Sequence, residues 1–494
     1  MSSIFNRIRQ WPYYIFLFSV FFVLHGFAKY FRFVSATSAL LLSLFYIAVS
    51  LVIAAFFYLF YKKFSKAALI TFFIMAFHFF FGNILDLLTG IFKQGFVLRY
   101  SFIVPAFLVA ATILFFIIKK RSTVFTITYY LNILMVILII IDTGTLLFRV
   151  SSKKKGLALQ GTDTGDVFSL CDTCPKPDVY IILLDEYAGA RELKDIFHYD
   201  NQPFYDSLGL RGFKTIANSH SNYNYTPYST ATTLNMKYLD PQKTSDAKKG
   251  YKYAIDDIND NRTVNFFLAN GYRFFNYSPF TVAYQSAPAE GSFVPVNTKL
   301  ITAGTFLTRF EKDVWLSVAD KMNITWYLKK SMYVTLKDND LIYNLTKNIA
   351  ETKTGPKVIY THLLMPHYPY YYNEAGELRS FDTLRKSLFE NTEHYLSYLK
   401  YTNKQMTVLI DHILSHSSMP PVIALISDHG YRHYKNNRDP KYYYSNLLSI
   451  HLPGGNYSLY SDSTSNINFF RILLNSEFNQ KLPLLEDKTF LIDF

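Results

Sequence analysis

Cysteine is nearly absent from this sequence, which contains only two cysteines among its 494 residues. Both lie in one short stretch, at Cys171 and Cys174, so disulfide bonds cannot hold the rest of the chain together. The C-x-x-C spacing occurs outside a βαβ unit and is therefore weak evidence for redox chemistry. We expect a structural short-loop disulfide, which requires an exported, oxidising setting.

The sequence also lacks the patterns by which proteins usually bind nucleic acids. Its formal net charge is +13, yet the lysines and arginines are spread along the chain among 40 tyrosines and 46 phenylalanines. No basic helix, zinc-finger spacing or RNP-like motif is present, so nucleic acid is not an expected partner. Internal repeats are absent as well.

Charged residues are scarce in residues 1–150, where long runs of Phe, Leu, Ile, Val and Ala dominate. Each run is long enough to cross a hydrocarbon core of about 30 Å. No small-residue cleavage site follows the first run, so we expect a membrane anchor instead of a removable signal peptide. The sequence predicts a transmembrane domain of five helices, near residues 12–34, 39–61, 68–92, 101–118 and 124–147.

Basic residues in the connecting loops favour an N-terminus in the cytoplasm. This orientation puts one set inside (Arg7, Arg9, Lys62, Lys63, Lys66, Lys119, Lys120 and Arg121) and a smaller set outside (Lys29, Arg32, Lys93 and Arg99). An odd number of spans then delivers the C-terminal half to the extracytoplasmic side of the inner membrane. Lys153, Lys154 and Lys155 favour the opposite orientation, although an exported triplet also suits contact with membrane lipid phosphates.

Three ionisable residues, His25, His78 and Asp86, lie inside the predicted spans. Ionisable residues within a membrane span are functional candidates by default. A polar side chain satisfied within a helix bundle explains each of them equally well. The sequence leaves both interpretations open.

From residue 177 onward, short apolar strands alternate with amphipathic helices, which predicts an exported α/β domain over 177–494 after a linker at 151–176. The segment 179–184, VYIILL, is apolar throughout, as expected for a strand buried on both faces of a parallel sheet. We expect further strands at 271–276, 358–364 and 422–426, and helices near 202–210, 263–270 and 384–415.

Three of these strands are followed by side chains that can bind metals. Asp185 and Glu186 follow the first strand, His367 follows the third, and Asp428 and His429 follow the last. Ligands of open α/β sheets bind beyond the carboxyl ends of the strands. Asp185, Asp428 and His429 form an O,O,N set suited to Zn²⁺ or Mn²⁺, with Mg²⁺ as a further candidate. Each residue taken alone is equally explained as part of an ordinary turn after a strand.

The segment 221–236, SNYNYTPYSTATTLNM, predicts a helix whose first position is Pro227. Thr226 then stands just outside the helix, next to its unpaired N–H groups and the positive end of its dipole. A plain N-cap is one interpretation of Thr226. The other is a nucleophile and fourth metal ligand, because a helix N-terminus is suited to holding a phosphate carried on the hydroxyl.

In this order the motifs resemble the sulfatase-like branch of the alkaline phosphatase superfamily, over roughly residues 177–475. Its membrane-anchored members, the lipoteichoic acid synthases and lipid A phosphoethanolamine transferases, also place about five spans before an exported catalytic domain. The S-D-H-G signature at 427–430 is the most specific match. The resemblance implies an alkaline-phosphatase/sulfatase-like α/β/α sandwich, while residues 280–355 match no motif of the family.

The resemblance assigns roles to individual residues. It implies metal ligands at Asp185 (with Glu186 as a substitute), Asp428 and His429, and a nucleophile at Thr226. Ser229 matches the serine of the C-x-P-S-R motif and is expected to contact substrate. His367 resembles the histidine that contacts the substrate phosphate in relatives and is expected to be catalytic, assisting proton transfer or charge stabilisation. Arg432 and His433, just past the signature, either clamp phosphate oxygens or lie on a solvated loop. His362 is expected to be buried by the alternation of its strand.

A threonine at position 226 distinguishes this sequence from true sulfatases, which use a cysteine or serine converted to formylglycine. The resemblance therefore implies a membrane-bound, metal-dependent phosphotransferase with a phospho-threonine intermediate. The expected donor is a phospholipid carrying phosphoethanolamine or phosphoglycerol, and the expected acceptor is a glycan or a lipid. Two alternatives remain from the sequence: a sulfatase-like hydrolase of phosphate or sulfate esters, and a non-catalytic exported binding protein.

Overall fold

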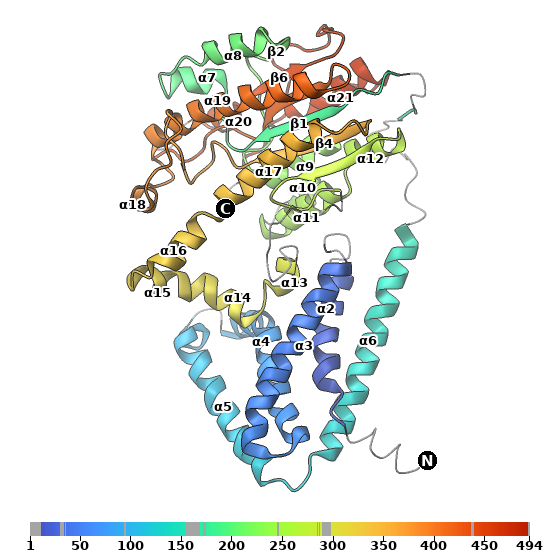
Figure 1. Cartoon of the computed structure of the whole chain (residues 1–494), viewed down its shortest axis with the longest axis vertical. Coiled ribbons are helices and arrows are strands. Elements are labelled where there is room, and N and C mark those ends of the chain that lie inside the picture. The colour runs from blue at the N-terminus through green and yellow to red at the C-terminus, as the bar shows by residue number, and fades with distance from the viewer. Residues whose placement is uncertain are drawn as a thin grey trace. The chain divides into compact units, whose positions relative to one another are not determined.

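A computed structural model of the chain describes residues 11–29, 34, 36–92, 95–153, 168–170, 174–244, 247–283, 285, 287–288, 298–435 and 439–492. The described residues divide into two compact units (Figure 1). The first, which we call the membrane unit for its apolar helices, lies within Met1–Gly156 and Gly291–Leu328. The second, which we call the catalytic unit after the activity that the sequence predicts, lies within Leu157–Glu290 and Lys329–Phe494. Cys174 is disulfide-bonded, and Cys171, the only other cysteine, lies outside the described residues.

Apolar helices build the membrane unit. Within the described residues, four helices are long and apolar enough to cross a membrane, and the first helix, with 16 residues, is shorter than the span predicted near 12–34. Aromatic and aliphatic side chains from several helices form one buried cluster. The elements are α2 (Tyr14–Lys29), α3 (Ala36–Tyr61), α4 (Phe64–Phe92), η1 (Phe96–Leu98), α5 (Tyr100–Lys120) and α6 (Phe125–Lys153).

A later segment of the chain also belongs to the membrane unit. It contains α13 (Lys299–Thr302), α14 (Phe306–Phe310), η3 (Glu311–Trp315) and α15 (Leu316–Lys321). The Gly82 N–H in α4 donates to the Gly304 carbonyl at 2.8 Å, and the Phe306 ring packs on those of Phe77 and Phe81. The sequence-based division placed this segment in the exported domain, because its short helices carry no pattern that distinguishes a membrane-packed segment.

The catalytic unit is built on a six-stranded sheet in its described part. The strand order is β2-β6-β5-β1-β4-β3, and β6 is antiparallel to its neighbours β5 and β2. The four expected strands are present, whereas β2 and β6, of 3 and 4 residues, are too short to show a hydropathy pattern. The bounds are β1 (Val179–Leu184), β2 (Phe213–Thr215), β3 (Arg273–Tyr277), β4 (Lys357–Leu363), β5 (Val422–Ser427) and β6 (Leu448–His451).

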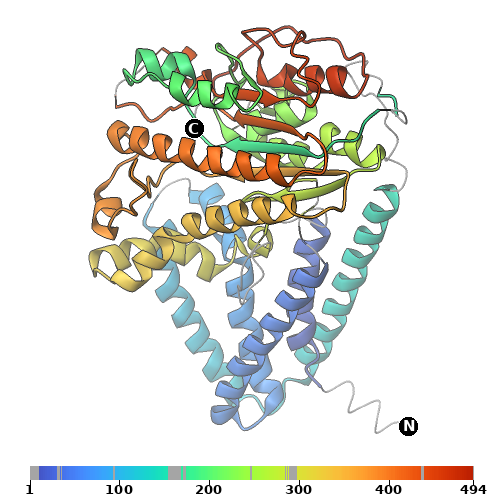
Figure 2. The ribbon, with the colours of Figure 1, turned by 45° about the horizontal axis from the view of Figure 1, so that its top comes forward.

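Helices cover both faces of this sheet, which makes the unit a three-layered α/β/α sandwich. Alternate residues of β1 enter different cores: Ile181 packs with one set of helices and Ile182 with the other. The first face is covered by α9 (Thr226–Asn235), α11 (Ala247–Asn259), α12 (Arg262–Ala269) and α21 (Asn466–Glu477). The second is covered by α8 (Gln202–Gly209), α17 (Val334–Ala350) and α19 (Thr392–His416), the last two running across the near face in Figure 2.

The remaining helices are short, and one predicted boundary changes. They are α7 (Ala190–Asp195), α10 (Pro241–Thr244), α16 (Thr325–Met332), α18 (Phe381–Lys386) and α20 (Lys441–Tyr444). The helix expected over 384–415 begins at Thr392, because the Asn391 side chain accepts the His394 N–H at 3.0 Å and caps it there.

A buried arginine fixes the far end of α9, the helix that begins at Thr226. Met236 ends this helix in the left-handed region, at φ 54°, and its carbonyl accepts bonds from Arg471 Nε at 3.0 Å and Nη2 at 2.6 Å. Arg471 Nη1 donates to the Pro483 carbonyl at 2.8 Å. The arginine is fully buried, so it ties α9 to α21 and to the C-terminal segment.

Replacing Arg471 with methionine should destabilise the catalytic unit by about 2–4 kcal/mol, because the buried Met236 carbonyl and the Pro483 carbonyl lose their charged donor. Thermal unfolding of the purified full chain measures the change. Lys481→Met, which removes an exposed lysine from the same region, is the matched control and should alter stability by no more than about 0.5 kcal/mol. Equal melting of the two variants would contradict this account of Arg471.

Candidate functional site

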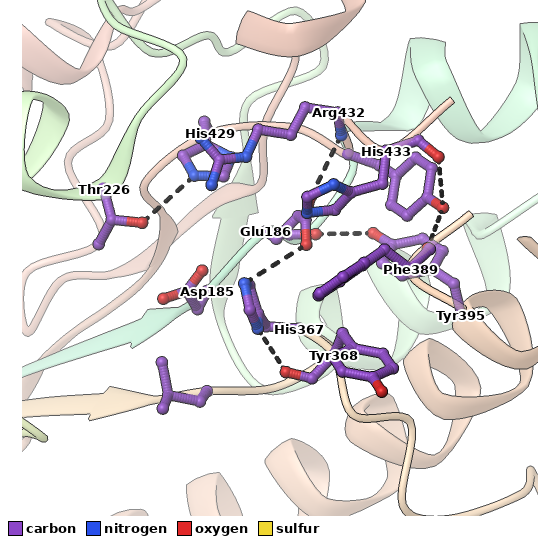
Figure 3. A network of polar contacts seen from close by, with 12 residues as sticks. Asp185, Glu186, Thr226, His367, Tyr368, Phe389, Tyr395, His429, Arg432 and His433 are labelled. Carbon is purple, nitrogen blue, oxygen red and sulfur yellow. Dashed lines mark hydrogen bonds and ion pairs between the residues drawn. The ribbon is translucent and has the colours of Figure 1, made fainter. Parts of the chain in front are cut away.

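Three adjacent strands end at one edge of the sheet and carry the predicted site residues there. Strand β1 lies between β4 and β5, so Asp185 after β1, His367 after β4 and Asp428 after β5 converge. Figure 3 shows Asp185, His367 and His429 gathered with Thr226, the residue that begins α9. The convergence follows from the parallel direction of the three strands, whose carboxyl ends meet at one edge.

Asp185, Asp428 and His429 form the first group of potential metal ligands. One donor atom from each lies within 4.8 Å of the others, and all three residues are buried. Asp428 Oδ1 accepts the N–H groups of Glu186 and His429, both at 3.0 Å. Asp428 Oδ2 and Asp185 Oδ1 are buried without a hydrogen-bond donor among the described residues. Each carboxylate is therefore held in place through one oxygen, and its other oxygen is available to bind a metal ion.

His362 is a site residue that the sequence analysis did not assign. It is fully buried on β4, and its Nε2 lies 3.0 Å from Asp185 Oδ2, to which it donates. Burial alone would raise the pKa of Asp185, but the imidazoles of His367, His362 and His429 bring that pKa well below its usual value. The alternation of the strand correctly predicted that His362 is buried. Its contact with Asp185 could be predicted only from the register between β1 and β4, which the sequence does not show.

Thr226 lies beside the first group. Its Oγ1 is 3.3 Å from His429 Nε2, while His429 Nδ1 donates to the Gly430 carbonyl at 2.8 Å. This tautomer leaves the Nε2 lone pair directed toward Thr226 (Figure 3). The residue before the helix is Tyr225, and Thr226 itself is the first helical residue, so the expectation that Thr226 stands just outside the helix is wrong by one position.

Ser229 supports the first group from within α9. It is 1% exposed, and its hydroxyl donates to the Asp428 carbonyl at 2.6 Å. The hydroxyl thus fixes the loop that carries Asp428 to the helix that carries Thr226. The predicted contact of Ser229 with substrate remains a prediction.

Glu186, His367 and His433 form a second group of potential ligands next to the first. Glu186 is fully buried in the left-handed region, at φ 59°, and its carbonyl accepts the Tyr395 hydroxyl at 2.8 Å. Its carboxylate oxygens lie 3.3 Å from His433 Nε2 and 3.9 Å from His367 Nε2. Glu186, the suggested substitute for Asp185, therefore belongs to a separate group, because the strained backbone turns adjacent side chains apart.

The two histidines of the second group differ in their tendency to hold a proton. Burial alone would lower the pKa of His367, but Asp185, Glu186 and the Tyr368 carbonyl, which accepts from Nδ1 at 2.6 Å, raise it above its ordinary value. Burial lowers the pKa of His433 in spite of Glu186. His367 is thus suited to donating a proton and His433 to remaining neutral.

Arg432 reaches back toward the segment before Thr226. Its guanidinium lies 4.7 Å from the centre of the Tyr225 ring, and Nη1 donates to the Asn224 carbonyl at 3.2 Å. Its Nε is buried without an acceptor among the described residues. The guanidinium therefore retains a donor for an anionic group next to Thr226.

The surroundings of Gly430 explain why the S-D-H-G signature ends in glycine. A Cβ at this position would collide with the carbonyl oxygens of Tyr442 and Ser445 and with the carboxylate of Glu192. The close approach of these groups leaves no room for a side chain. The loop after His429 can follow its course only with glycine.

The first group fits a divalent metal ion. It combines two carboxylates with an imidazole, a donor set that Zn²⁺ and Mn²⁺ accept. Among the described residues, two buried carboxylate oxygens have no hydrogen-bond donor, and the hydrogen bond from Nδ1 fixes the tautomer of His429. These three atoms can bind an ion while the rest of each side chain is held in place.

A family model described as Sulfatase matches residues 193–470, more than half of the chain. The chain belongs to the sulfatase family. This membership confirms the resemblance, and the α/β/α unit after apolar helices confirms the predicted fold class. The sulfatase-family chain is accordingly an enzyme. Among curated proteins, none matches it.

Solved structures similar to this sulfatase-family chain are distant in sequence. The C-terminal periplasmic domain of EcEptC from Escherichia coli is 12% identical, with a TM-score of 0.39, and the match covers 62% of this chain and 84% of that chain. Lipooligosaccharide phosphoethanolamine transferase A (EptA) from Neisseria meningitidis is 11% identical, with a TM-score of 0.37, and the match covers 94% of this chain and 95% of that chain.

Asp428→Asn should reduce the divalent metal retained by the purified full chain to about a tenth or less, because the only unpaired oxygen of that carboxylate is lost. His362→Gln should weaken retention about 10–100-fold, since the imidazole orients Asp185. Elemental analysis after dialysis measures both. Asp439→Asn, which alters an exposed carboxylate, is the control, and equal metal content in all variants would contradict the assignment.

An ion pair secures the segment that leads to Thr226. His220 Nε2 contacts the Asp487 carboxylate, whose other oxygen accepts from Asn222 Nδ2 at 3.0 Å. Burial alone would lower the pKa of His220, but Asp487 raises it; burial alone would raise the pKa of Asp487, but His220 lowers it. The raised pKa of the histidine stabilises the fold below about pH 6.5, and the lowered pKa of the aspartate does so above about pH 3.9.

His220→Gln should therefore lower the melting temperature of the catalytic unit more at about pH 5.5 than at about pH 8.5, because the stabilisation is lost as the pH rises through the raised pKa of His220. Thermal melting of the full chain at both pH values tests this. His416→Gln, at an exposed histidine, serves as control. A deficit that is equal at both pH values would show that the pair does not act through its charge.

Proposed function

We propose that this chain is a membrane-bound, metal-dependent phosphotransferase that moves the head-group phosphoryl unit of a phospholipid through a phospho-Thr226 intermediate. The observation that carries the proposal is the Thr226 hydroxyl, 3.3 Å from His429 Nε2 and beside the buried carboxylates of two strand ends. The acceptor is a hydroxyl of a glycan or another lipid. The apolar helices anchor the enzyme in the inner membrane, with its catalytic unit on the extracytoplasmic side.

Asp185, Asp428, His429 and the Thr226 hydroxyl would hold a divalent metal ion. Such an ion, when bound, lowers the pKa of a coordinated hydroxyl and polarises a phosphoryl oxygen. The protein prepares this set through His362, which orients Asp185, and through the two N–H groups that hold Asp428.

In the first step, Thr226 Oγ1 attacks the phosphorus of the donor lipid. The bond from Oγ1 to phosphorus forms while the bond from phosphorus to the glycerol oxygen breaks, and diacylglycerol leaves. Threonine loses its proton to water, and the departing glycerol oxygen gains one. His367, whose pKa is raised and whose Nδ1 is held by the Tyr368 carbonyl, is the residue placed to donate that proton from Nε2.

Charged groups around Thr226 hold the phosphoryl unit during transfer. Arg432 has a buried Nε donor without an acceptor in the described part of the chain, next to the segment that ends at Thr226. The N-terminus of α9 adds its unpaired N–H groups and the positive end of its dipole. In the second step the acceptor hydroxyl attacks phosphorus and gives its proton to His367, the bond to Oγ1 breaks, and Thr226 regains a proton from water.

Mass analysis of the peptide containing Thr226 tests the proposal. The full chain, supplied with Mn²⁺ or Zn²⁺, is incubated with phosphatidylethanolamine or phosphatidylglycerol and then digested. An adduct on Thr226 is expected with one of the lipids, and its mass identifies the head group. Thr226→Ala should carry no adduct, whereas Thr392→Ala, at an exposed position on α19, should carry as much as the wild type.

Two other outcomes of this experiment would each favour a different function. Diester cleavage without an adduct, at full activity in Thr226→Ala, would refute the threonine intermediate and favour a hydrolase. No adduct, no cleavage and no bound metal would refute catalysis and favour a non-catalytic binding protein.

A further inference from the structure

The membrane unit contains a cavity that the proposed reaction does not use. Its volume is about 240 Å³, roughly the share of eight liquid water molecules. The phenyl rings of Phe22, Phe79 and Phe80 line one part, and the polar side chains of His25, Lys29 and Asn83 line another. The cavity therefore combines an apolar floor with ionisable groups between α2 and α4.

The segment at 301–304 lines this cavity, and two glycines allow it to approach α2 and α4 closely. A Cβ at Gly26 would lie 2.7 Å from the Ile301 side chain, and one at Gly82 would lie 3.0 Å from the Gly304 carbonyl oxygen. The hydrogen bond from Gly82 N–H to that oxygen fixes the segment on α4. The cavity is thus built by three separate parts of the membrane unit.

The sequence left open whether His25, His78 and Asp86 are functional or are polar groups satisfied within a helix bundle, and the contacts of His25 bear on this. Its Nδ1 lies 3.1 and 3.2 Å from the two carboxylate oxygens of Asp142 on α6. Asp142 is largely buried, whereas His25 is more than half exposed, so the carboxylate orients the imidazole. His78 instead packs on the Tyr46 ring, and Asp86 is exposed. Of the three ionisable residues noted in the spans, His25 is the one that lines the cavity.

We propose that this cavity binds the phosphate group of a membrane phospholipid. The Lys29 ammonium supplies positive charge and Asn83 supplies an amide donor, while the His25 imidazole, held by Asp142, is a further polar group of the lining. The phenyl rings pack against the glycerol and the first acyl carbons, while the volume is too small for the whole lipid. The inference rests on the proposed function only in the role of this lipid, which is that of the phosphoryl donor.

Native mass spectrometry of the full chain released from lipid nanodiscs tests the proposal. The chain is offered phosphatidylethanolamine or diacylglycerol with identical acyl chains. Phosphatidylethanolamine should be retained and diacylglycerol lost, because only the former carries phosphate. Lys29→Gln should weaken retention about tenfold, as expected for one charged contact. Asn83→Leu alters an exposed position, so it offers a second test that does not endanger folding.

Lys120→Gln, an exposed lysine at the end of α5 away from the cavity lining, is the control and should retain the lipid fully. Equal retention of diacylglycerol, or undiminished retention in both cavity variants, would overturn the proposal. Displacement of the lipid by millimolar inorganic phosphate would assign the site to a soluble anion and would also overturn it. Thr226→Ala should still retain the lipid, so a failure of the Thr226 chemistry is distinguishable from a failure of the cavity.

Discussion

The carboxylate of Asp428 sets the geometry on which the catalytic unit depends. One of its oxygens accepts the backbone N–H groups of Glu186 and His429, which joins the ends of β1 and β5. The carbonyl of the same residue accepts the Ser229 hydroxyl, which brings in the helix of Thr226. Because these groups are buried, any displacement leaves polar atoms without partners, and the arrangement is held narrowly.

The same edge of the sheet concentrates charge that a purely structural core would avoid. Three buried carboxylates face four imidazoles within one small region, and several of their atoms lack protein partners among the described residues. Such a cluster weakens the folded state unless a ligand completes it. Conflicts between local stability and local chemistry are typical of functional sites. The buried Arg471 and the surrounding sandwich of helices provide the rigidity that the cluster itself does not.

The sequence predicted the structure best where a local pattern around a residue identifies its position. Apolar strands ending in Asp185 and Asp428, and a proline helix start after Thr226, predicted the central sheet and the first ligand group. Partners contributed by other strands were not predictable in the same way. The contact between His362 and Asp185 depends on the register of β4 against β1, which no local pattern specifies.

Two further features that the sequence analysis did not predict have similar physical causes. The strands β2 and β6 are so short that tertiary pairing, and not hydropathy, defines them. The segment around Gly304 joins the membrane unit through glycine contacts and stacked phenyl rings, although its own composition resembles that of an ordinary loop. In both cases contacts with residues far away in the sequence determine the structure, so the local sequence does not predict it.

Asp185 and Glu186 are chain neighbours that serve different ligand groups, because the left-handed conformation of Glu186 turns the backbone between them. Sequence alignment cannot separate two such carboxylates: a one-residue shift matches acid to acid while exchanging their positions in the site. For relatives with a single acidic residue at this strand end, only the spatial neighbours of its side chain decide which of the two it replaces. Evolutionary comparison of this family must therefore be made in three dimensions at this point.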